Sequence, residues 1–132
     1  MYQESNKKTT PRVRIIQKIY SSLLNPEEAI IYPKSQYKKF IKDVVTGTLE
    51  RVELIEETIN SHLSKDIDLK RTDKLLKIII FAAIFELLFI HKNPKNVIIS
   101  EYLKASEFFL EKAQIKYLNA ILDKISKLIR ID

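Results

Sequence analysis

Apolar residues recur every three or four positions along most of the chain, the spacing of helices with one buried face. Thr10 followed by Pro11 predicts a helix start, because threonine is a good N-cap and proline is tolerated at the first helical position. Arg12 lies over the apolar stripe of this helix, and we expect its side chain to reach solvent off the helix end. The stripe comprises Val13, Ile16, Ile19, Tyr20 and Leu23.

Further helices are predicted along the rest of the chain, so the pattern indicates an all-α protein. They are a short helix around 27–30, a long one at 35–63 with a kink or break at Gly47, a central one at 73–90 capped by Thr72, one opened by Pro94, and a last one at 114–129. The helix opened by Pro94 carries the apolar residues Val97, Ile98, Tyr102, Ala105 and Phe109. We expect a single helical domain at 10–132 after a flexible basic tail at 1–9.

The longest apolar run, Ile78–Ile90, predicts a buried central helix. It is shorter than the ~20 residues that a membrane-spanning helix needs, and Glu86 interrupts it. A buried carboxylate is costly unless it is paired or hydrogen-bonded. We therefore expect Glu86 to accept helix-terminal N–H groups or to pair with a Lys or Arg; the alternative is a catalytic acid.

Composition argues against several kinds of site. The chain has no cysteine, which excludes disulfides and thiolate catalysis and fits a cytoplasmic protein. Its one glycine is too few for a phosphate-cradling loop. His62 and His91 have no neighbouring histidine or cysteine with which to share a metal. We expect no enzymatic activity, no cofactor and no metal.

Positive charge is concentrated at the start of the chain. Residues 1–14 hold half of the net charge of +6, with Lys7, Lys8, Arg12 and Arg14 against Glu4 alone. A local excess of this kind favours a polyanion partner, and a solubilising tail is the alternative. Arg14 and Lys18 fall on the open face of the first predicted helix.

An aromatic residue beside basic ones marks the last predicted helix. Tyr117 lies next to Lys116 and suits stacking on an unpaired base, although half-buried packing is the alternative. Asn119 and Asp123, one turn apart, are candidates for interhelical hydrogen bonds or for contact with a partner.

Four segments together resemble the NusB family of bacterial transcription antitermination factors. They are "RVRIIQKIY", "AAIFELLF", "NPKNVIISEYLKAS" and "YLNAILDKI", and the resemblance runs from Arg12 to Arg130. Arg12 matches the last arginine of the family's basic segment, and Gln17 and Tyr20 match its Gln and Tyr. Tyr117, Asn119 and Asp123 match an aromatic, an Asn and an Asp in the family's last helix.

The resemblance implies two packed helical bundles of about seven helices, and RNA binding in place of catalysis. It implies that the chain pairs with NusE, a small ribosomal subunit protein. The pair would bind boxA-type RNA in ribosomal RNA leader transcripts and join an antitermination complex on RNA polymerase. RNA-binding residues would be Lys7, Lys8, Arg12, Arg14, Lys18, Tyr20, Lys116 and Tyr117, and partner-binding residues would be Tyr117, Asn119 and Asp123.

The chain departs from the family where RNA is expected to bind. Lys7, Lys8, Thr9 and Thr10 stand where arginines are usual, and lysine lacks the planar fork of arginine. Phe81 and Ala113 stand where the family has an arginine and, in some members, an acidic partner contact. The alternative is therefore a NusB-like accessory or scaffold protein, for example of an rRNA methyltransferase, with weak or no RNA binding. Monomer and homodimer both remain open.

Overall fold

Six helices make up the part of the chain that the computed structural model describes, residues 10–132. They are α1 (Pro11–Leu24), α2 (Lys38–Glu50), α3 (Val52–Leu63), α4 (Lys74–Phe89), α5 (Lys95–Ser106) and α6 (Lys112–Ile129). The all-α prediction is confirmed, with six helices where about seven were expected. The predicted flexible tail, with Lys7 and Lys8, lies outside the described residues.

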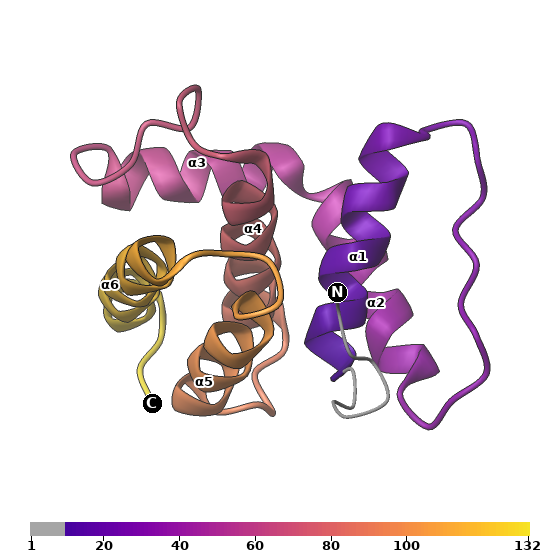
Figure 1. The fold of residues 1–132 in the computed structure, drawn as a ribbon. Coiled ribbons are helices and arrows are strands. Elements are labelled where there is room, and N and C mark those ends of the chain that lie inside the picture. Colours follow the sequence, from indigo (N-terminus) through magenta and orange to yellow (C-terminus); the bar gives the residue numbers. More distant parts are fainter. Residues whose placement is uncertain (1–9) are drawn as a thin grey trace.

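Helix α4 is the centre of the molecule. It contacts each of the other five helices, with α1 and α2 on one side and α3, α5 and α6 on the other (Figure 1). Every residue from Ile78 to Leu87 is buried, so this part of the helix has no solvated face, as its uniformly apolar sequence predicts. Within residues 10–132, no helix combines the length and the apolarity that crossing a membrane requires.

Helix α1 starts where the sequence predicts. The Thr10 hydroxyl accepts a hydrogen bond from the Val13 N–H at 3.3 Å and Pro11 is the first helical residue. Val13, Ile16 and Ile19 are buried in the core, but Leu23 is 48% exposed, so its predicted burial is wrong. The connector after α1 turns away from the end of the helix and runs along the outside of α1 and α2 (Figure 1).

The predicted helix at 27–30 is absent, and this prediction is wrong. The chain makes a single turn there, closed by a 3.1 Å hydrogen bond from the Glu28 N–H to the Asn25 carbonyl, and then runs on without regular structure. A helix this short has an unfavourable nucleus and needs tertiary packing to form. Only Ile30 in this segment packs against the core.

The predicted long helix at 35–63 is two helices, and the break falls at Arg51 and not at Gly47. Gly47 is buried inside α2, where an added Cβ would overlap the ring of Phe85 on α4. Glycine at this position therefore allows α2 and α4 to approach each other closely. The Arg51 guanidinium lies 4.7 Å from the centroid of the Phe89 ring and donates to the Gly47 carbonyl at 3.5 Å.

One predicted cap and one predicted helix start are displaced, by one and by two positions. Asp73, not Thr72, caps α4, because its carboxylate accepts from the Leu76 N–H at 3.2 Å while the Thr72 hydroxyl donates to the Asp68 carbonyl. Helix α6 begins at Lys112 and not at Gln114, since Glu111 and Gln114 form a reciprocal capping box.

The end of the described chain is tied to the turn between α4 and α5. Arg130 donates to the carbonyls of Leu87, Ile90 and Asn93 at 2.7, 3.1 and 2.9 Å. Asp132 pairs with Arg130 and accepts from the Lys95 N–H at 2.9 Å. On α5 itself, the predicted apolar residues Ile98, Tyr102 and Ala105 are buried, whereas Val97 is 46% exposed. Phe109 lies after the end of the helix.

Candidate nucleic-acid interface

Arg12 is buried, contrary to the expectation that its side chain reaches solvent. Its Nε and Nη2 atoms donate to the two oxygens of Glu86 at 3.0 and 2.7 Å. Its guanidinium also lies 4.7 Å from the centroid of the Phe40 ring. Because Arg12 falls within the apolar stripe of α1, its side chain points at α4 and contacts the Glu86 carboxylate there.

Glu86 is the centre of a polar cluster that is buried except at Asn93, which is partly exposed. The Tyr102 hydroxyl donates to one of its oxygens at 2.7 Å, and the Asn93 amide donates to the other at 3.4 Å. The carboxylate side chain has no exposed surface. The expectation that a Lys or Arg pairs with Glu86 is confirmed. The cluster joins α1, α4 and α5, so it holds the two sides of the molecule together.

Electrostatics fix the protonation states of this cluster. Burial alone would lower the pKa of Arg12, but its hydrogen bond and charge interaction with Glu86 raise that pKa overall. Burial, reinforced by the Glu86 carboxylate, raises the pKa of Tyr102 well above its ordinary value. Arg12 therefore stays charged and Tyr102 stays neutral in the physiological range, and the arrangement is that of a structural ion pair.

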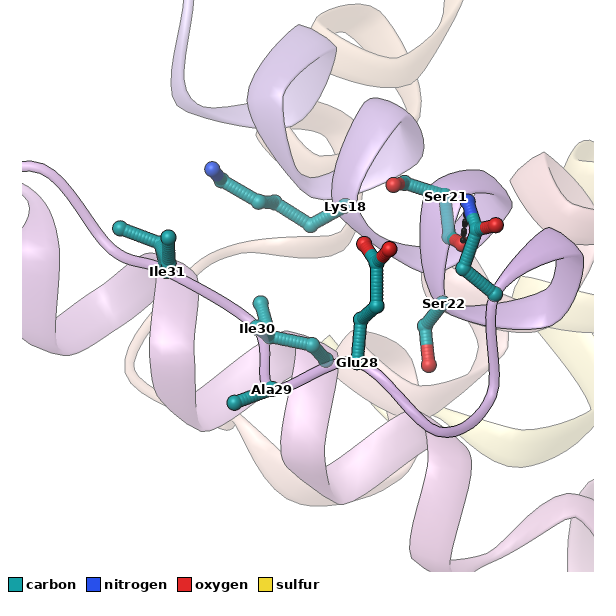
Figure 2. A pocket seen from close by; sticks show the side chains of 8 residues that line it. Lys18, Ser21, Ser22, Glu28, Ala29, Ile30 and Ile31 are labelled. Atoms are coloured by element: carbon teal, nitrogen blue, oxygen red, sulfur yellow. Dashed lines mark hydrogen bonds between the residues drawn. The ribbon is translucent and has the colours of Figure 1, made fainter.

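The other predicted RNA-binding residues of α1 lie closer to solvent. Arg14, Lys18 and Tyr20 are each half-buried. Lys18 lines a groove of about 190 Å³ between the second half of α1 and the connector that follows it. In Figure 2, Lys18 and Glu28 extend into this groove from its two walls, with Ser21 beside them.

On α6, Tyr117 is anchored to the connector between α3 and α4. Its hydroxyl donates to the Asp66 carbonyl at 2.6 Å, and the residue remains 37% exposed. Partial burial, followed by the charge of Asp66, raises the pKa of Tyr117. The Lys124 ammonium pairs with the Asp66 carboxylate at 2.7 Å. Tyr117 is thus both anchored to the neighbouring connector and partly exposed.

The remaining predicted residues of α6 are on its open side. Lys116 and Asn119 are exposed, and Asp123 forms an ion pair with Lys127 at 3.1 Å. Helices α1 and α6 do not contact each other, because α4 and α5 lie between them. The predicted RNA-binding residues that the structure describes therefore form two groups, one on α1 and one on α6.

Neither histidine is placed to hold a metal. His62 and His91 are exposed, and a ring nitrogen of each contacts a backbone carbonyl of its own segment. No group of three or more His, Cys, Asp or Glu side chains in residues 10–132 has a metal-binding arrangement.

Comparison with known proteins identifies the family. Residues 4–127 match the model of the NusB family. The chain belongs to the NusB family. The transcription antitermination protein NusB of Lysinibacillus sphaericus is 29% identical over 116 residues, which cover 87% of this chain and 91% of that protein. The NusB protein of Rickettsia typhi is 28% identical, with 92% of each chain covered.

The fold is also that of NusB. A solved structure of T. maritima NusB superposes with a TM-score of 0.76 at 22% sequence identity, covering 89% of this chain and 88% of that one. The NusB relationship implies an RNA-associated role in transcription antitermination. Sequence reasoning missed the Arg12–Glu86 partnership, although the position of Arg12 within the apolar stripe was a usable signal for it.

Proposed function

We propose that this protein is an RNA-binding transcription antitermination factor. With NusE it binds boxA-type RNA of ribosomal RNA leader transcripts, and the pair joins an antitermination complex on RNA polymerase. The match to the NusB family over residues 4–127 is the observation that carries this proposal. The protein acts as a cytoplasmic adaptor and not as an enzyme.

RNA contact is proposed for the basic start of the chain and for α6. Lys7, Lys8, Arg14 and Lys18 would hold phosphates, which gives affinity without sequence reading. Tyr20, Lys116 and Tyr117 would meet unstacked bases, where sequence is read in single-stranded RNA. The partial exposure of Tyr117 supports this role. Tyr117, Asn119 and Asp123 are the proposed contacts with NusE.

One observation favours a second candidate, a NusB-like accessory protein with weak RNA binding of its own. Arg12, the one residue of the chain that matches the family's arginine segment, is buried and bound to Glu86. Its guanidinium would have to leave that carboxylate to grip a phosphate, which would strand a buried charge. We therefore assign Arg12 to the fold and expect RNA binding to depend on NusE.

Titration of a fluorescent boxA-type RNA with the chain alone, with NusE alone and with their mixture tests this dependence. Fluorescence anisotropy is expected to show tighter binding by the mixture than by either protein, since NusE adds surface to the same RNA. Equal affinity of the mixture and of NusE alone would favour the accessory protein.

A further inference from the structure

Three cationic side chains meet around one tyrosine on the side of the molecule that α1 and α2 form. Arg14 and Lys18 of α1 and Lys38 of α2 line a small depression with Tyr32 and with Pro33. The Lys18 ammonium lies 6.0 Å from the centroid of the Tyr32 ring. Among residues 10–132, no carboxylate lines this depression.

Helix α2 extends this positive surface. Lys42 is exposed and lies one helical turn after Lys38, so the two side chains share a face. Lys39 is different, because its ammonium pairs with Asp43 at 2.8 Å. Neither Lys38 nor Lys42 forms an ion pair with any described residue. Like charges held close together favour binding of an anion that spans them.

Nothing in the assignments above gives Lys38 or Lys42 a function. We propose that Lys38 and Lys42 are phosphate contacts for the single-stranded RNA of the proposed function, extending its path from α1 onto α2. The inference rests on that function. Helices α1 and α2 begin at the same end of the molecule (Figure 1), and Arg14 and Lys18 belong both to the proposed α1 contact and to the depression.

The groove between α1 and the connector that follows it lies beside this depression and is expected to exclude the RNA backbone. It shares Lys18 with the depression, but Glu28 extends into it from the opposite wall (Figure 2). A carboxylate repels a phosphate, so the backbone of the RNA is expected to pass from α1 toward Lys38 and Lys42 and not along the groove.

The test is a salt series of boxA-type RNA binding by the chain with NusE, comparing the parent with K38Q/K42Q. Each lost phosphate contact on a single strand lowers the slope of log K against log salt by about 0.7. The double variant is therefore expected to lose about 1.4 from the slope and to bind several-fold more weakly at low salt. Lys-to-Arg changes at both positions keep the charge and should keep the slope.

A matched control removes two exposed lysines elsewhere. K70Q/K104Q makes the same change in net charge at exposed positions of the α3–α4 connector and of α5, neither of which is a proposed contact, and should leave the slope unchanged. If K38Q/K42Q keeps the parental slope, the inference is overturned and the proposed function stays intact. The same conclusion follows if K38Q/K42Q loses binding to NusE and no RNA contact. A parent that binds boxA-type and scrambled RNA equally overturns both.

Discussion

At the scale of single residues, Arg12 and Glu86 are the charges on which the fold depends. Both are buried, and their two direct hydrogen bonds at 3.0 and 2.7 Å are supported by Tyr102 on α5. A buried ion pair adds little stability compared with a well-packed apolar pair, but removing one partner leaves the other charge buried and uncompensated. Its loss should therefore destabilise the protein strongly.

The Glu86→Gln variant isolates this effect, because the amide keeps the shape of the side chain and removes its charge. We expect the free energy of unfolding to fall by about 3 kcal/mol, since the Arg12 guanidinium is left buried without a counter-charge. Urea denaturation monitored by circular dichroism measures it.

Two comparisons make the measurement decisive. Glu57→Gln changes an exposed carboxylate and should stay within about 0.5 kcal/mol of the parent. Adding Arg12→Met to Glu86→Gln leaves no buried charge and should recover part of the loss. A loss below ~1 kcal/mol in Glu86→Gln would contradict the structural importance of the pair.

The sequence predicts that Glu86 needs a partner but not which residue supplies it. A carboxylate inside an apolar run implies pairing on energetic grounds alone. The partner is 74 positions away, and only the packing of α1 on α4 brings the two together. From the sequence alone, Arg12 is expected in solvent, because a long charged side chain in the first turn can extend beyond the helix end.

At the scale of elements, the contact between α2 and α4 is set by Gly47. The ring of Phe85 occupies the space that a Cβ at position 47 would need. Arg51, one turn later, covers Phe89 and donates to the Gly47 carbonyl. The end of α2 is thus fixed by packing against α4, and the glycine costs helix propensity in exchange for close approach.

Replacing Gly47 with alanine should destabilise the protein by about 1–2 kcal/mol. Overpacking against Phe85 outweighs the ~1 kcal/mol that alanine gains in helix propensity. Thermal or urea unfolding measures the change, and Asn60→Ala at an exposed position inside α3 is the control. Adding Phe85→Leu should recover part of the loss, and a more stable Gly47→Ala variant would show that the contact is loose.

Element positions were predictable where local chemistry decides them and not where packing does. The Thr10–Pro11 start of α1 and the apolar α4 follow from capping and hydrophobic period. The break at Arg51 does not, because the same glycine that suggests a kink is a packing residue. The turn at 26–28 shows that a cap signal without a buried face does not make a helix.

At the scale of the whole molecule, the proposed RNA contacts lie on two sides of a shared central helix. Lys18 and Lys38 meet around Tyr32 on one side, and Lys116 and Tyr117 lie on the other. The family relationship could be predicted from four spaced segments, and the match over residues 4–127 confirms it. The cluster around Tyr32 could not, because its members come from two helices and the connector that joins them.

The most direct test of the central claim is the RNA selectivity of the complex with NusE. Dissociation constants for boxA-type RNA and for a scrambled RNA of equal length and composition are compared at ~0.15 M salt. The account predicts a preference for boxA of at least about tenfold, which corresponds to about 1.4 kcal/mol. Equal dissociation constants for the two RNAs would contradict it.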